Sequence, residues 1–300
     1  MACQPYIASE AASRRNRGWF DLDIIIGLLL SLLGLFAGFL GALVGVGGGV
    51  IVVPILILLF DLNAQRAVGT SLLMIVFTAL SATFAYIRQK RIDWKIGLMA
   101  ATTTVPGAVI GGFATKYVPS RFLSIILGVT IFLIAAAMLR RSYRTGKVAT
   151  VVAHGPQARK GVWARRIVDS TGKLFEYHAK IYSGLAFLFL GGLASGFLGI
   201  GGGLIVVPIF VAMVGLPMHI AVATSMLTMI FTSIAGVSTH ILLGNVLVDY
   251  AAPLVVGILI GAQLGARTAK QLRSTGLERV FAVAVLLIGI VLIIRQLMGI

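Results

Sequence analysis

The chain has 300 residues, of which 59% are apolar and only 11% are charged, a balance that excludes an ordinary soluble domain. Its net charge of +16 comes mostly from one central segment and from short loops, which indicates orientation in a membrane rather than binding of nucleic acid. The only cysteine, Cys3, excludes a disulfide framework and a Cys-x-x-Cys site. We therefore expect an integral membrane protein.

The first 20 residues are polar, contain three arginines and lack the pattern of a removable signal peptide. We expect them to form an N-terminal tail, followed by a first membrane repeat over residues 21–140. Segments long or apolar enough to lie in a bilayer define that repeat. In chain order they are Ile24–Val44, Val50–Phe60, Val68–Ile87, Trp94–Thr115 and Phe122–Leu139.

Residues 141–180 form a basic linker. From Arg140 to Lys180 there are ten lysines and arginines but only two acids, Asp169 and Glu176. Because cytoplasmic loops are enriched in basic residues, we expect the linker in the cytoplasm. It is either a solvated loop that orients the chain or a contact for anionic lipid.

A second membrane repeat is expected over residues 181–300, with the same succession of apolar segments. They are Ile181–Leu198, Leu204–Val214, Ile220–Leu243, Tyr250–Ala269 and Val280–Leu297.

Two sequence words occur in both repeats at the same distance from each other. Gly45–Ile55 reads GVGGGVIVVPI, and Gly199–Ile209, 154 residues later, reads GIGGGLIVVPI. The words AVGTS at Ala67–Ser71 and AVATS at Ala221–Ser225 keep the same offset. This register predicts two homologous halves, each with a helix broken by glycines.

The short apolar segment after each glycine run leaves the topology open. Eleven helical residues rise only about 16 Å, roughly half of a hydrocarbon core. If each segment crosses the membrane, each half has five crossings and the halves are inverted; if it does not cross separately, each half has four and they are parallel. Both arrangements place 18 of the 25 basic residues on the linker side, so charge does not choose between them.

The glycine runs are the first candidate site. Consecutive glycines break a helix and free backbone N–H groups, and the helix that restarts after them has a positive N-terminal end suited to an anion. Two such ends facing each other would form an oxyanion site at mid-depth; a plain hinge or a close helix crossing is the alternative. The candidate residues are Gly47, Gly48, Gly49, Gly201, Gly202 and Gly203.

Hydroxyl and amide side chains extend this candidate site. Thr70 and Ser71, with Thr224 and Ser225, could donate to an oxyanion without a buried charge, or could bridge helices. Gln263, which stands between two glycines, is either a substrate contact or a bond between helices.

None of the nine acids falls in the middle of an expected span, which argues against a proton relay or a carboxylate sodium site. Asp93 and Asp249 are expected to cap helices at the interface. Arg267 is expected to extend to the membrane surface or to attract an anion. His240 is expected to be a surface or packing residue, with a role in pH response as the alternative, and no spacing of histidines indicates a metal site.

These words resemble the sulfite exporter TauE/SafE family, also described as the toluene-sulfonate uptake permease group. The resemblance rests on Gly45–Gly49 with Pro54, on Gly199–Gly203 with Pro208, and on the Thr-Ser words. It covers about residues 24–298, and it departs where Ala223 replaces the glycine seen at Gly69.

The resemblance implies an all-α polytopic transporter of the bacterial inner membrane, with two repeats of four to five segments. It implies secondary transport, most readily export, of sulfite, an organosulfonate or a related anion, with no cofactor and no enzymatic activity. A glycine run without the Gly-Lys-Ser/Thr of a phosphate-binding loop agrees with the last point. Two alternatives remain open: a passive anion channel and a membrane scaffold that does not transport. The expected partners are a small anion and membrane lipid, not nucleic acid.

Overall fold

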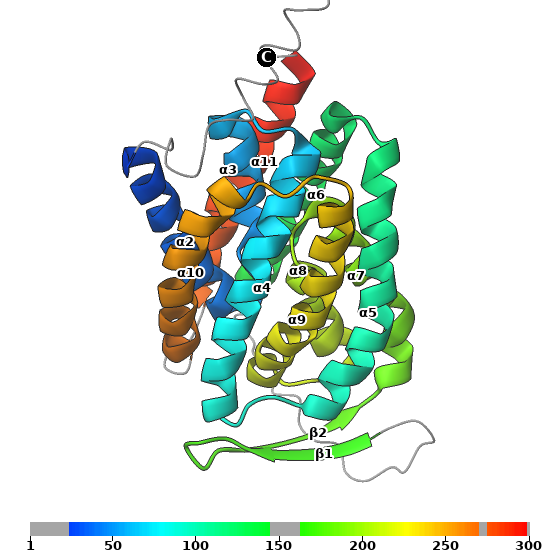
Figure 1. Cartoon of the computed structure of the whole chain (residues 1–300). Coiled ribbons are helices and arrows are strands. Elements are labelled where there is room, and N and C mark those ends of the chain that lie inside the picture. Colours follow the sequence, from blue (N-terminus) through cyan, green and yellow to red (C-terminus); the bar gives the residue numbers. More distant parts are fainter. Residues whose placement is uncertain (1–23, 145–162, 270–274, 299–300) are drawn as a thin grey trace, which may run out of the picture.

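A computed structural model describes residues 24–144, 163–269 and 275–298 (Figure 1). The first half of the chain consists of helices that match the expected apolar segments to within a few residues. They are α2 (Ile24–Val44), α3 (Gly49–Phe60), α4 (Ala64–Arg88), α5 (Trp94–Ala114), the 3-10 turn η1 (Thr115–Tyr117) and α6 (Ser120–Arg144).

The second half repeats this order after a short two-stranded sheet. The elements are β1 (Trp163–Val168), β2 (Leu174–Ala179), α7 (Ile181–Leu198), α8 (Gly203–Ile209), its π-helical continuation η2 (Phe210–Val214), α9 (Met218–Leu242), α10 (Val248–Thr268) and α11 (Thr275–Met298).

Six helices in the described segments are long and apolar enough to cross a membrane, judged by length and composition. They are α2, α4, α5 with its terminal turn, α7, α9 and α10. Large apolar side chains such as Leu28, Leu32 and Phe36 on α2 are exposed, as expected for a surface that faces lipid. The predicted class, an all-α polytopic membrane protein, is confirmed.

The first helix of each half packs against the other half of the chain. α2 lies along α10, and α7 lies along α5, while α4 and α9 contact each other at the centre (Figure 1). Glycines allow this close approach, because a Cβ atom on Gly257 would collide with the carbonyl of Ser31, and one on Gly192 with that of Thr104. The two halves are therefore interlocked.

Each glycine run turns the chain back on itself. The Ser31 hydroxyl near the start of α2 donates to the Pro253 carbonyl on α10, and the Phe60 ring at the end of α3 lies 5.5 Å from the Tyr250 ring. Both ends of the α2–α3 pair thus lie at the start of α10. The α7–α8 pair does the same, since the Lys180 N–H donates to the Val214 carbonyl at 2.9 Å. Each pair is a helical hairpin that begins and ends on one side.

Corresponding helices of the two halves run in opposite directions. Thr70, near the start of α4, is bonded to Leu247 beyond the end of α9, and Thr224, near the start of α9, is bonded to Asp93 beyond the end of α4. With a returning hairpin and three further helices in each half, the halves are inverted rather than parallel. The sequence alone left that choice open.

The end of the bundle that carries the β-hairpin is called here the linker side, and the opposite end, where α11 terminates, the far side (Figure 1). The strands pair antiparallel, with Trp163 opposite Ala179 and Val168 opposite Leu174. These strands were not predicted from the sequence, in which residues 141–180 indicated only a basic linker. Residues 145–162 of that linker lie outside the described segments.

Candidate functional site

The candidate site is built from the two glycine breaks. Gly45, Gly47 and Gly48 have φ values of 85°, 86° and 83°, in the left-handed region that residues with a Cβ atom rarely adopt. Their counterparts Gly199, Gly201 and Gly202 have φ values of 70°, 73° and 76°. α3 and α8 restart after these residues without a side-chain cap, so their first N–H groups are available to another acceptor.

The two breaks contact each other. A Cβ atom on Gly49 would collide with the Gly199 carbonyl, and one on Gly203 with the Gly45 carbonyl. The side chains of Ile75 and Met229, at the middle of α4 and α9, lie against the same glycines. The structure therefore brings the predicted glycines of both halves to one buried place.

The paired serines fasten each break to the opposite half. The Ser71 hydroxyl lies 2.8 Å from the Gly199 carbonyl, and the Ser225 hydroxyl lies 3.2 Å from the Gly45 carbonyl. Each hydroxyl also lies 2.8 Å from a carbonyl of its own helix. Because a serine has one proton, it can exchange between these acceptors or turn toward a ligand.

The paired threonines hold the loops that follow the helices. The Thr70 hydroxyl accepts from the Leu247 N–H, and the Thr224 hydroxyl accepts from the Asp93 N–H, both at 3.1 Å. Both threonines are fully buried. An accepted bond leaves the hydroxyl proton for a further acceptor, so bridging between helices and donation to an anion are compatible.

Gln263 and Arg267 lie elsewhere, on α10. The Gln263 amide donates to the Ser81 carbonyl on α4 at 2.9 Å, six residues along the helix from Ile75. Arg267 is exposed in the last turn of α10. The structure therefore places both away from the glycine breaks, with Gln263 as a bond between helices.

Sequence reasoning missed one hydroxyl at the break. Ser195, on α7, is fully buried beside Gly202, and its hydroxyl has no hydrogen-bond partner within the described residues. The position 154 residues earlier is Gly41, which packs directly against the backbone of Gly48. Because the two halves differ here, their comparison could not single out the serine.

Two further buried side chains were not recognised as a pair. The Tyr86 hydroxyl donates to the Ala42 carbonyl at 2.8 Å, and His240 Nε2 lies 3.0 Å from the Gly196 carbonyl. Tyr86 and His240 are separated by the same 154 residues as the other paired positions, although their side chains differ. That offset was the signal in the sequence that could have identified them as a pair. His240 is thus a packing residue rather than a surface residue.

Asp93 is a buried acid whose carboxylate accepts several hydrogen bonds. It caps α5 by accepting from the Ile96 N–H at 3.2 Å, as predicted. Arg165 of β1 donates to both carboxylate oxygens at 2.8 Å, and the Tyr177 hydroxyl of β2 donates at 2.6 Å. Burial opposes ionisation of Asp93, but these donors outweigh it and hold the pKa of the carboxyl below its ordinary value.

The matching prediction for Asp249 is wrong. The N-cap of α10 is Leu247, and Asp249 is an exposed residue of the first helical turn. It can stabilise the helix dipole there but does not cap the helix.

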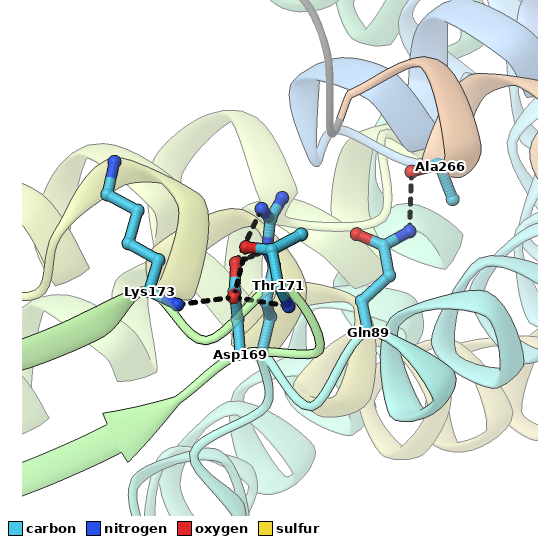
Figure 2. A network of polar contacts seen from close by, with 6 residues as sticks. Gln89, Asp169, Thr171, Lys173 and Ala266 are labelled. Atoms are coloured by element: carbon cyan, nitrogen blue, oxygen red, sulfur yellow. Dashed lines mark hydrogen bonds and ion pairs between the residues drawn. The ribbon is translucent and has the colours of Figure 1, made fainter.

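A second buried ion pair connects the β-hairpin with the α4–α5 loop. Arg91 Nη2 lies 2.9 Å from Asp169 Oδ2, and the side chains are 6% and 0% exposed. Asp169 also accepts from the N–H groups of Thr171 and Lys173, as Figure 2 shows. Burial raises the pKa of Asp169, but bonds from Thr171 and Arg91 dominate and hold it well below the ordinary value.

Comparison with known proteins identifies the same kind of molecule. Residues 30–292 match the family described as sulfite exporter TauE/SafE. A probable membrane transporter protein of Bacillus subtilis, YunE, is 34% identical over 89% of this chain and 97% of its own length. A probable membrane transporter protein of Methanocaldococcus jannaschii is 29% identical over 82% of this chain and 87% of its own length. No solved structure matches.

Proposed function

The chain belongs to the sulfite exporter TauE/SafE family of membrane transporters, and we propose that it is a secondary carrier of a small sulfur-containing oxyanion. Sulfite or an organosulfonate is the substrate, export across the bacterial inner membrane is the direction, and the basic linker is cytoplasmic. Membership of this family indicates a transporter rather than an enzyme. The substrate, the direction of transport and the orientation in the membrane are our proposal.

The observation that carries the proposal is the meeting of the two glycine breaks. The N-termini of α3 and α8 start there, beside the hydroxyls of Ser71 and Ser225. The unpaired hydroxyl of Ser195 adds a donor next to Gly202. These N–H and O–H groups donate hydrogen bonds without carrying a formal positive charge. They suit a small oxyanion whose negative charge is stabilised by the helix dipoles.

The absence of acids from α4 and α9 supports an anion over a cation. Neither Ala64–Arg88 nor Met218–Leu242 contains an aspartate or a glutamate. A carboxylate proton relay or a carboxylate sodium site at this depth would require one. Gln263 and Arg267 are not part of the proposed binding site, since α10 holds them away from the breaks.

A passive channel is the alternative within transport. The direct contact of the two breaks supports a carrier, because backbone and apolar side chains fill the place where a conducting channel would need a continuous path. A scaffold that does not transport is the alternative outside transport, and it predicts no flux at all.

Flux into proteoliposomes is the decisive experiment. Labelled sulfite and small sulfonates should show saturable uptake and counterflow driven by unlabelled anion. Unsaturable conductance would indicate a channel, absence of all flux a scaffold, and cation flux without anion flux would reject the proposal.

Orientation is tested separately, with single cysteines introduced by Gly155→Cys and Met298→Cys in a Cys3→Ser background. A membrane-impermeant thiol reagent should label the residue-298 cysteine, and not the residue-155 cysteine, in intact cells. The reverse pattern would place the linker outside.

A further inference from the structure

The linker-side end of the bundle is crossed by the β-hairpin, which is attached through two charge pairs of opposite polarity. In one pair the carboxylate of Asp93 belongs to the bundle and the guanidinium of Arg165 to the hairpin, at 2.8 Å. In the other, Arg91 belongs to the bundle and Asp169 to the hairpin, at 2.9 Å. Three of the four side chains are nearly or fully buried, and that of Arg165 is 25% exposed.

The hairpin also seals the bundle with apolar side chains and ties α10 to it. Phe175 and Tyr177 of β2 pack into one buried cluster with residues of α5 and α9, including Ile96 and Ala221. The backbone of Gln89 accepts from the Ser170 N–H, and its amide donates to the Ala266 carbonyl on α10 at 2.8 Å (Figure 2). A single small element thus connects the ends of several membrane helices.

This attachment reaches the candidate site through one residue. Asp93 holds the hairpin with its carboxylate and holds Thr224 with its N–H. The next residue, Ser225, contacts the carbonyl of the first glycine break. Asp93 therefore places the hairpin next to the segment of α9 that contacts the break.

The far side shows that the threonine does not need the charge pair. There the Leu247 N–H is bonded to Thr70 at 3.1 Å, the same length as on the linker side, although Leu247 has no carboxylate. The loop that contains it is partly exposed, with Leu242 77% exposed at the end of α9 and open space around Gly244. The carboxylate of Asp93 therefore serves the hairpin rather than the threonine.

We propose that the β-hairpin is a latch that keeps the linker side of the transport path closed, and that both charge pairs separate each time this side opens. The inference rests on the proposed function, in that the path leads to the site at the glycine breaks. On the far side, the charge pair between Arg295 and Asp61, at 2.6 Å, joins α11 to the end of α3, and residues 243–247 of the α9–α10 loop include no charged side chain.

Cysteine accessibility tests the latch. In a Cys3→Ser background, Ala221→Cys reports the linker side and Ala67→Cys, 154 residues earlier, reports the far side; both alanines are fully buried one turn before the paired serines. Impermeant maleimide is applied to the appropriate face of oriented vesicles, without substrate. Arg165→Ala should increase the labelling rate at position 221 about tenfold, the effect of one charge-assisted hydrogen bond, and should decrease labelling at position 67.

Arg166→Ala is the matched control. Arg166 lies on the same strand but forms a 3.5 Å pair with Glu176 in which both side chains are exposed, so its loss should change neither rate. Tyr177→Phe removes a single hydroxyl from Asp93 and gives a milder variant should Arg165→Ala lower the yield of folded protein. The double exchange Asp93→Arg with Arg165→Asp should restore slow labelling at position 221.

Equal rates for Arg165→Ala and Arg166→Ala would overturn the latch. Acceleration at both reporter positions would also overturn it, since that pattern means general loosening rather than opening of one side. Because no anion is present, labelling can support the latch even if sulfur oxyanions are not transported, and flux can support the function even if the latch fails.

Discussion

The two loops that end α4 and α9 occupy equivalent places and differ in almost every side chain. In the α4–α5 loop, Gln89, Arg91 and Asp93 are buried beneath the β-hairpin. In the α9–α10 loop, Gly244 is exposed and Leu247 is partly exposed. Both loops nonetheless donate a backbone N–H to a threonine of the opposite half. The bond to the threonine is common to both loops, because each threonine is part of the candidate site. The side chains differ because only the α4–α5 loop, on the linker side, holds the β-hairpin.

The largest effect is expected from substitutions at the glycines through which the two halves contact each other. Gly49→Ala and Gly203→Ala each place a Cβ atom against a carbonyl of the other break, and we expect a loss of stability of at least about 3 kcal/mol together with loss of transport. Yield of monodisperse protein and sulfite flux measure this. Gly27→Ala is the control, since nothing lies within 4 Å of a Cβ atom there; a well-folded, active Gly49→Ala protein would contradict the packing described.

The second prediction concerns the charge pairs of the β-hairpin, a feature that the two halves do not share. Asp169→Asn leaves Arg91 buried without its partner, which costs roughly 3–5 kcal/mol, and the hairpin should become a substrate for trypsin. Glu176→Gln breaks only an exposed pair, for which about 0–1 kcal/mol is expected. Equal resistance of both variants to limited proteolysis would show that the buried pair does not hold the hairpin.

The third prediction concerns the four matching hydroxyls. Thr70→Ala, Ser71→Ala, Thr224→Ala and Ser225→Ala should each weaken anion affinity about tenfold to a hundredfold, because a hydrogen bond to a charged group is worth roughly 1.5–3 kcal/mol. Changes in opposite halves should not be additive. Isothermal titration of purified variants measures the affinity. If all four bind normally and only the yield falls, the hydroxyls serve packing alone.

Ser195→Ala separates binding from packing more cleanly. The buried hydroxyl has no hydrogen-bond partner among the described residues, so its removal breaks no hydrogen bond there and should leave thermal stability unchanged or slightly higher. Affinity for the anion should fall about tenfold if this hydroxyl donates to it. Unchanged affinity would exclude Ser195 from the site and make the second break equivalent to the first.

The smallest effect is expected from pH. The pKa values of Asp93 and Asp169 are lowered from the ordinary 3.8 on folding, so both acids stabilise hairpin docking fully above that value and lose the contribution as the pH falls through the lowered pKa. The labelling rate of a cysteine at position 221, divided by the rate of a free thiol at the same pH to correct for thiolate formation, should therefore be constant from about pH 5 to 8. A change near pH 6 would instead implicate His219, whose ring lies 6.4 Å from Phe175.

Hydropathy and the repeated words were enough to predict the helices and the meeting of the two breaks. Long apolar segments specify helices locally, and the constant offset of Gly47 from Gly201 placed both runs at equivalent positions. Helix direction was not predictable, because an eleven-residue segment can cross or return. It became clear only from distant contacts such as that of Phe60 with Tyr250.

The β-hairpin was missed although its sequence carries a signal. Apolar and polar residues alternate in Leu174–Ala179, and the turn contains Gly172 at a φ of 82°, but the basic character of the linker dominated the interpretation. Its partners were beyond prediction, since Arg165 and Asp93 are 72 residues apart and no local rule pairs them. Gln263 was misleading because flanking glycines mark close helix contact as readily as a ligand.

The interlocking of the halves also has a consequence for biosynthesis. α2 packs along α10, which the ribosome produces more than 200 residues later. Until then the glycine-lined face of α2 lacks the helix against which it packs, and the first half remains incompletely packed in the bilayer. Chains that terminate before α10 would present that face to the quality-control machinery of the membrane. The fold can therefore be completed only after translation has reached α10.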